Sequence, residues 1–146
     1  MDAISAGVLL GWLTEAQEKG VISKEQLGAE VAFDHVDGYL KVLENLVRQP
    51  NDLYRLLARG TYQAAQSLGG REYALTLGKN EMAGYHTGYA NILGLSFWAR
   101  HSHLDNAGYS IDQKAARFNY SKEHTKKLDR ETLARMTVSY LSKAGI

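Results

Sequence analysis

The chain contains no cysteine and only one proline among its 146 residues. Without thiols it can form no disulfide bond, and its own side chains cannot hold an iron–sulfur cluster through thiolates. The single proline, Pro50, leaves few breaks in the backbone, as expected for a helix-rich chain. The two absences therefore favour a helical protein that takes any iron–sulfur centre from elsewhere.

A charge excess of either sign is also missing, since 17 basic and 16 acidic side chains leave a formal net charge of +1. Such a balance gives no field to attract a polyanion, so we expect no nucleic-acid partner. The longest apolar run, residues 7–13, is far shorter than the ~18–20 residues that span a membrane. No basic segment precedes it, so we expect no signal peptide, no membrane partner and, by default, a cytoplasmic location.

Apolar residues recur at three- and four-residue steps along much of the chain, which predicts amphipathic helices. The first helix should run from Asp2 to Lys19, with Asp2 or Ser5 as its N-cap and Gly20 at its end. Four further helices are expected at 36–49, from Asn51 or Asp52 to 69–70, at 93–100, and from Asp129 to near Gly145. Residues 29–35 and 105–127 read as irregular.

Three local features complete the expected fold. Gly7 and Gly11 lie four apart in the first helix, where each costs about 0.5–1 kcal/mol relative to alanine, so a second helix or a ligand should pack there, and we favour the helix. Residues 73–77 alternate like a short strand, followed by a turn at 78–80. We therefore predict a mainly α, irregular multi-helix single domain over residues 1–146, with one short β element.

The segment from 81 to 109 holds most of the chemistry-bearing side chains. His86, His101 and His103 lie there beside Asp105, and an extended His101–His103 pair could bind one metal ion. On a helix the same pair would diverge, and the alternative is that these polar residues cap helices and bond buried backbone. Five aromatic residues could line a pocket, although we favour a place in the core: Tyr85, Tyr89, Phe97, Trp98 and Tyr109.

An ordered series of segments resembles the tungsten-containing aldehyde ferredoxin oxidoreductases. Residues 2–7 are similar to the D-T-I-S-T-G of that family, which overlaps the end of its first pterin motif. The other matching segments are 13–20, 57–69, 77–85, 94–97 and 100–104. The resemblance depends on the order and spacing of these segments, which together cover roughly residues 2–104.

The resemblance implies tungsten, or molybdenum, on two pterin dithiolenes beside a [4Fe–4S] cluster in the full-length enzyme. It further implies oxidation of aldehydes to carboxylic acids, with ferredoxin as the electron acceptor. Asp2 matches the last residue of the D-x-x-G-L-D motif, a pterin contact. His103 matches a histidine near the metal that serves in proton transfer or substrate orientation, a role that suits an imidazole near pH 7.

The departures from the family pattern are equally informative. The family's D-P-R-G is replaced here by residues 86–89, so its arginine is missing, and its R-G element is Arg100–His101. The cluster cysteines would lie before Met1 and the second pterin motif at or beyond the C-terminus. We therefore expect a fragment or subunit that holds no cofactor and no metal alone, is inactive alone, and pairs with the missing part of the enzyme or a partner subunit. The alternatives are a non-catalytic helical interaction module, possible as a homo-oligomer, and a small histidine-based metal-binding domain.

Overall fold

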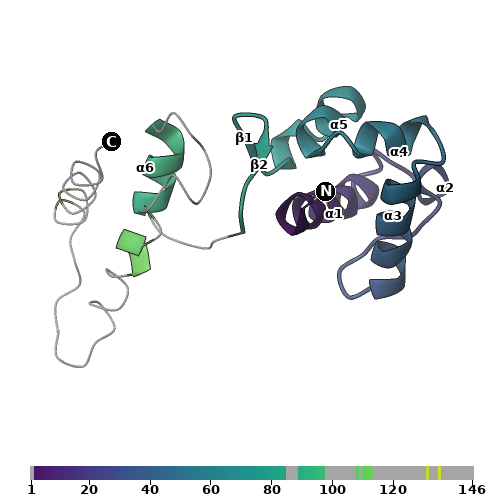
Figure 1. Cartoon of the computed structure of the whole chain (residues 1–146), viewed down its shortest axis with the longest axis horizontal. Helices are drawn as coiled ribbons and strands as arrows, with labels where there is room; N and C mark the ends of the chain where they lie inside the picture. Colours follow the sequence, from purple (N-terminus) through teal and green to yellow (C-terminus); the bar gives the residue numbers. More distant parts are fainter. Residues whose placement is uncertain are drawn as a thin grey trace. The chain divides into compact units, whose positions relative to one another are not determined.

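The computed structural model describes residues 2–84, 89–97, 108, 110–113, 131 and 135. Its contacts divide the chain into two compact units, 1–84 and 85–146, which are described separately. The first unit is mainly helical, with one small antiparallel sheet, as predicted (Figure 1). Its elements are α1 (Ala3–Glu18), α2 (Lys24–Leu27), α3 (Val36–Arg48), α4 (Asp52–Leu57), α5 (Thr61–Leu68), η1 (Arg71–Tyr73), β1 (Thr76–Leu77) and β2 (Asn80–Glu81). The single-domain organisation stays a prediction.

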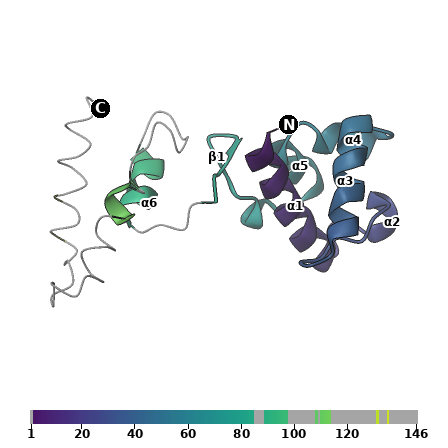
Figure 2. The same ribbon diagram turned by 60° about the horizontal axis from the view of Figure 1, so that its bottom comes forward.

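Helix α1 begins where the sequence predicted. The Asp2 side chain caps it by accepting a hydrogen bond from the Ser5 backbone N–H, and Gly20 follows its end in the left-handed region with φ +71°. Leu9, Trp12 and Leu13 lie on the face of the helix that packs into the core, and each is at most 2% exposed. In Figures 1 and 2, α1 packs against α5 and β2, while α3 packs against α4.

Helix α3 ends as predicted, but only part of its expected apolar side is covered. That side comprises Val36, Tyr39, Leu40, Leu43, Leu46 and Val47, and of these Tyr39, Leu43 and Leu46 pack in or against the core. Gln49 adopts a left-handed conformation just before Pro50, which cannot continue the helix. Val42 and Leu46 are buried, whereas three members of the predicted apolar face are exposed: Val36, Leu40 and Val47. Periodicity identified the helix, but its apolar residues span an arc of roughly 160°, and packing selected the part of that arc that is buried.

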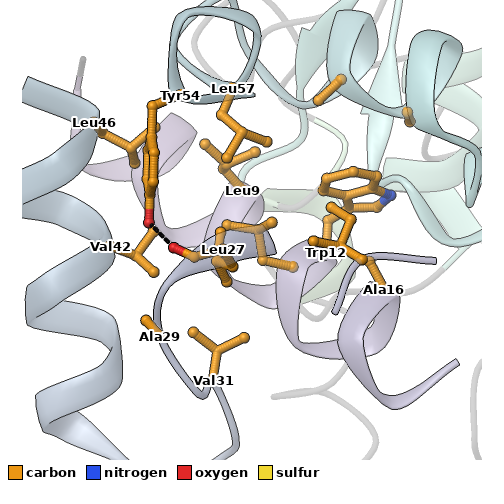
Figure 3. Packing of buried hydrophobic residues seen from close by; sticks show 14 residues of the cluster. Leu9, Trp12, Ala16, Leu27, Ala29, Val31, Val42, Leu46, Tyr54 and Leu57 are labelled. Carbon is orange, nitrogen blue, oxygen red and sulfur yellow. Dashed lines mark hydrogen bonds between the residues drawn. The ribbon is translucent and has the colours of Figure 1, made fainter. Parts of the chain in front are cut away.

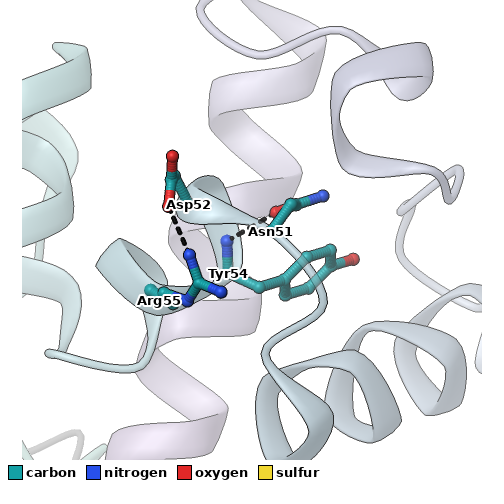
Figure 4. Close-up of polar contacts among 4 residues, drawn as sticks. All are labelled: Asn51, Asp52, Tyr54 and Arg55. Carbon is teal, nitrogen blue, oxygen red and sulfur yellow. Dashed lines mark hydrogen bonds and ion pairs between the residues drawn. The ribbon is translucent and has the colours of Figure 1, made fainter.

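The prediction of one helix from Asn51 or Asp52 to residues 69–70 was wrong. The structure has two helices there, α4 and α5, separated near Gly60. Helix α4 ends at Leu57, and α5 starts after Gly60, whose φ of +99° and ψ of 165° are essentially confined to glycine and interrupt the helix. Asn51 caps α4 as expected, because its side-chain oxygen accepts from the Tyr54 N–H at 3.0 Å (Figure 4). An exposed Asp52–Arg55 ion pair at 2.6 Å lies on the same turn.

The β element is shorter than the predicted strand. Residues 71–73 form the 3₁₀ helix η1, and only Thr76–Leu77 pairs with Asn80–Glu81. Gly78 and Lys79 both have positive φ, which makes a tight hairpin turn with the right twist for two antiparallel strands. Thr76 is paired with Glu81 in this register, so the hairpin places Glu81 next to α1 and α5.

The core of the first unit lies between α1, α2 and the α3–α4 corner (Figure 3). Leu9, Leu13, Leu27, Val42 and Leu57 are fully buried in it. Its two polar aromatic groups are paired. The Tyr54 hydroxyl donates to the Leu27 carbonyl at 2.7 Å, and the Trp12 indole N–H donates to the Gly70 carbonyl at 2.9 Å. These bonds pair the polar atoms of the two bulky aromatic side chains that lie in the core.

In the second unit, α6 spans Tyr89–Phe97 and so begins four residues before the predicted helix at 93–100. The buried Asp112 carboxylate accepts from the Ala90 and Asn91 N–H groups at 3.1 and 2.8 Å, satisfying donors in the first turn of α6. The prediction of an irregular 105–127 was wrong at residues 108 and 110–113, which are helical. Residues 131 and 135 are helical as predicted, and Glu131 pairs with Arg135.

Candidate functional site

The N-terminal end of α1 meets the hairpin and the start of α5, and polar side chains gather at this junction. Four residues form what we call the Asp2–Ser5–Glu81 network: Asp2, Ser5, Thr61 and Glu81. Three different elements supply them, and their separation of up to 79 positions in the chain gives no local sequence signal. The network contains Asp2, the residue that the family resemblance assigned to the pterin.

Ser5 is the centre of the network. Its N–H donates to Asp2 Oδ1 at 2.9 Å, and its hydroxyl lies 3.0 Å from Asp2 Oδ2 and 3.2 Å from Glu81 Oε2. A serine hydroxyl has one hydrogen, so it can donate to one of these two carboxylates at a time. Asp2 and Glu81 therefore compete for the same donor.

The second carboxylate oxygen of Glu81, Oε1, is held by a hydrogen bond of its own. It accepts from the Thr61 backbone N–H at 2.8 Å, which satisfies one of the free donors at the start of α5. A Cβ atom built on Gly60 would lie 2.8 Å from the same oxygen, closer than real contacts allow. Gly60 thus suits its backbone conformation, and a side chain at this position would force the Glu81 carboxylate to shift.

The electrostatics of the network favour an ionised Asp2. Hydrogen bonds from the Ser5 N–H and hydroxyl lower the pKa of the exposed Asp2 carboxyl below its ordinary value. Thr61 is fully buried, and its hydroxyl oxygen has no hydrogen-bond partner within the part of the chain that the structure describes. The junction therefore combines an exposed hydrogen-bond acceptor, the Asp2 carboxylate, with a buried polar side chain, that of Thr61.

The glycine face of α1 lies open on a different side of the helix from Ser5, because two residues turn a helix by about 200°. A Cβ atom built at Gly7 or Gly11 would meet nothing within 4 Å. The expected packing of a second helix against these glycines was therefore wrong for residues 2–84. The other possibility, a ligand that approaches the backbone closely, remains a prediction.

The predicted site residues are only partly placed. Asp2 lies in the network, but His86, His101, His103 and Asp105 fall outside the described residues. Of the aromatic series, Tyr89 and Phe97 begin and end α6, and the Phe97 side chain is exposed. Among residues with a described position, no group of three histidine, aspartate or glutamate side chains could hold a metal ion.

Sequence reasoning missed Ser5 and Glu81 as one site. Ser5 was expected only as a possible cap, and Glu81 was noted only within the 77–85 family segment. Their hydroxyl–carboxylate contact joins residues 76 positions apart. Only the family segment that contains Glu81 could have drawn attention to it, because no spacing rule connects the two positions.

A small hollow of about 150 Å³ lies beside α5, separate from this network. Its polar lining comes from Tyr62, Gln66, Arg71 and Thr76. With the Gln66 amide oxygen turned towards it, Arg71 donates at 3.0 and 3.1 Å, so its guanidinium already has a partner. We therefore place the candidate site at the Asp2–Ser5–Glu81 network rather than at this hollow.

Comparison with known proteins gave one family and one curated relative. The family model described as "Aldehyde ferredoxin oxidoreductase, domains 2 & 3" matches residues 1–142. A protein of Pyrococcus furiosus named "Aliphatic sulfonate oxidoreductase, WOR-like subunit" is 34% identical over 65 residues, which are 44% of this chain but only 10% of that protein. No solved structure matched.

None of the helices in the described ranges is long and apolar enough to cross a membrane.

The ordered family segments found in the sequence are supported by the family match, which extends over nearly the whole chain. The mainly helical fold agrees with it. The chain belongs to the aldehyde ferredoxin oxidoreductase family, in the region of its domains 2 and 3.

Proposed function

We propose that this chain is the helical, pterin-contacting part of a tungsten-containing oxidoreductase that oxidises aldehydes to carboxylic acids and passes the electrons to ferredoxin. The observation that carries the proposal is the family match over residues 1–142. The name of the Pyrococcus relative adds aliphatic sulfonates as a second substrate class to test. Either reaction needs parts of an enzyme that this chain does not itself provide.

The residues of the chain fit one of the family's cofactors and not the other. A [4Fe–4S] cluster needs thiolate ligands, and the chain has no cysteine. A pterin needs hydrogen-bond acceptors for its ring N–H groups and room near the backbone. The exposed Asp2 carboxylate supplies an acceptor, and Gly7 and Gly11 leave the backbone open on another face of the same helix. We therefore assign the pterin, and not the cluster, to this chain.

Two side chains have roles in this proposal. Asp2 holds a pterin N–H through a charge-assisted hydrogen bond, while the backbone N–H of Ser5 keeps the carboxylate in place at 2.9 Å. His103 accepts or returns a proton at the substrate, which suits an imidazole whose ordinary pKa is near neutrality. When bound, the tungsten–pterin group supplies the two-electron oxidation.

The test uses the complete enzyme that contains this chain, purified from cells grown with tungstate. We expect bound pterin and tungsten, viologen-linked turnover of aldehydes or aliphatic sulfonates, and reduction of ferredoxin. Asp2→Asn should lower the pterin content, and His103→Ala should lower kcat with the pterin retained. Glu44→Gln is the matched control, since Glu44 pairs with the exposed Arg48 and with no other residue of the described ranges. Wild-type enzyme without pterin and without turnover of either substrate class would refute the proposal.

A companion measurement addresses the chain alone. After anaerobic reconstitution with iron and sulfide, the isolated chain should show no cluster absorbance and no stoichiometric iron, because it offers no thiolate. Aldehyde turnover should be absent for the same reason. Stoichiometric iron with cluster absorbance would show that the cofactor assignment is wrong.

A second candidate function is protein interaction through the apolar face of α3. Val36, Leu40 and Val47 are exposed on α3, with Val47 84% accessible, and Phe33 is exposed in the segment just before the helix. An apolar stripe of this kind on a helix marks a surface that another protein element covers. The 65 matched residues are only 10% of the Pyrococcus relative, so we propose that another part of the same oxidoreductase covers this face.

A further inference from the structure

We propose that the hollow beside α5 binds a small tetrahedral oxyanion, a phosphate or a sulfonate group, with Arg71 as its cation. The hollow is separate from the start of α1, so this binding is independent of the proposed pterin contact. Three elements supply its polar lining: α5 contributes Tyr62 and Gln66, η1 contributes Arg71, and β1 contributes Thr76.

The positive charge of Arg71 is not neutralised by any residue that the structure describes. Its guanidinium donates to the Gln66 amide oxygen at 3.0 and 3.1 Å, and that amide is itself neutral. A guanidinium carries five N–H donors, so the two bonds to Gln66 leave three. Within the described ranges, no ion pair joins Arg71 to a carboxylate. The glutamine therefore holds the guanidinium in place while its charge remains available to a ligand.

Two hydroxyl groups add donors at the same hollow. The side chains of Tyr62 and Thr76 are half-buried, and neither hydroxyl has a hydrogen-bond partner among the described residues. Each can donate its single hydrogen to an oxyanion. A tetrahedral oxyanion directs its oxygens to several sides, which suits donors that come from three elements. The two oxygens of a carboxylate lie in one plane and suit this arrangement less well.

The surrounding charges and the size of the hollow both favour an anion of this kind. No acidic side chain lines the hollow. Glu81 lies opposite Thr76 in the hairpin, but its two oxygens face the Thr61 N–H and the Ser5 hydroxyl. The volume of about 150 Å³ is room for several water molecules but lies below the roughly 300–1,000 Å³ of pockets for larger organic ligands.

Water competes for the same donors, because the Arg71 and Gln66 side chains are exposed. Each hydrogen bond to an anion replaces one to water, so binding depends on the charge of the guanidinium and on several donors acting together. We therefore expect weak but saturable binding that becomes weaker as the ionic strength rises.

Titration of the whole chain with inorganic phosphate and, separately, with methanesulfonate tests the site at constant ionic strength. Heteronuclear NMR follows the backbone N–H signals of residues 71–76, which should shift and reach saturation. Arg71→Gln should weaken binding at least about tenfold, since it removes the charge-assisted bonds. Tyr62→Phe, which keeps the ring, should weaken it about threefold. Arg59→Gln is the matched control, because Arg59 is also exposed but does not line the hollow.

Each outcome of the titrations is decisive. Saturable binding of either anion that is lost in Arg71→Gln and kept in Arg59→Gln supports the site, and the tighter of the two anions identifies the group it takes. No saturable shift with either anion in the folded wild type overturns the site. Binding that both arginine variants weaken equally, or that Arg71→Gln leaves unchanged, overturns it as well, since that is how an adventitious surface ion behaves.

Thermal unfolding of each variant checks that the chain is folded. If Arg71→Gln does not fold, Tyr62→Phe decides alone, because it removes one hydroxyl and leaves the ring in place. Unweakened binding in folded Tyr62→Phe would then overturn the site, and a loss of about threefold would support it.

Discussion

Replacing Gly60 with alanine tests the geometry on which the candidate site depends. The new methyl group would have two separate effects. It would force an alanine into φ +99° and ψ 165°, and it would place a carbon 2.8 Å from Glu81 Oε1. The neighbouring Thr61 N–H would then lose its carboxylate acceptor, because Glu81 has to move away.

The two effects can be given separate magnitudes. A non-glycine residue in this backbone region costs about 1–3 kcal/mol. Losing the half-exposed hydrogen bond between the Thr61 N–H and Glu81 adds roughly 1–2 kcal/mol, at the low end for a charged acceptor. Gly60→Ala should therefore lower the free energy of unfolding by about 2–5 kcal/mol. The contacts of the built Cβ atom are all to Glu81, so only the backbone part should remain when that side chain is absent.

Urea unfolding of four chains measures this coupling: wild type, Gly60→Ala, Glu81→Ala and the double variant. In the Glu81→Ala background, the glycine substitution should cost only about 1–3 kcal/mol, which leaves a coupling energy of roughly 1–2 kcal/mol. Costs that add to within about 0.5 kcal/mol would show that Gly60 and Glu81 do not interact in solution. Such additivity would also remove the support for a fixed Glu81.

Three further results are expected. Tyr54→Phe should lower the free energy of unfolding in urea by about 1–3 kcal/mol, because it leaves the buried Leu27 carbonyl without its 2.7 Å donor; a loss under about 0.5 kcal/mol would contradict this contact. Because the pKa of Asp2 is lowered in the folded chain, its contribution to stability is present above its ordinary pKa of 3.8 and is lost as the pH falls through the folded value. Acid unfolding should show this loss in the wild type but not in Asp2→Asn, and identical curves would refute the assignment. In sedimentation velocity, the isolated chain should self-associate through the α3 face, and Val47→Glu should weaken this association while the control Gln63→Glu on α5 does not; a strict monomer at high concentration would refute it.

Several features could be predicted from local sequence because their causes are local. The Asp2 cap, the end of α3 at Pro50 and the Asn51 cap each depend on residues within one turn of the chain. The tight turn at 78–79 is of the same kind. These elements were predicted correctly, because a cap or turn needs only the right side chain at a fixed offset.

The errors came from choices that depend on distant contacts. Gly60 was read as part of one long helix, since a glycine inside a helical pattern is tolerated and nothing nearby in the sequence shows that Glu81 occupies the space beside it. Val36, Leu40 and Val47 share the predicted apolar side of α3 with Leu46, yet the structure buries Leu46 and leaves those three exposed. Periodicity shows that a helix is amphipathic, but the neighbouring elements decide which apolar residues are covered.

The sequence by itself determined the helical character, the positions of the caps and turns, the family, and the lack of thiolate ligands, because each follows from residue types or their order along the chain. Only the tertiary structure decided that one serine hydroxyl lies between Asp2 and Glu81, since that arrangement needs a hairpin register and a helix start to meet the end of α1. Contacts between residues 76 positions apart are set by packing, and packing leaves no periodic signal in the sequence.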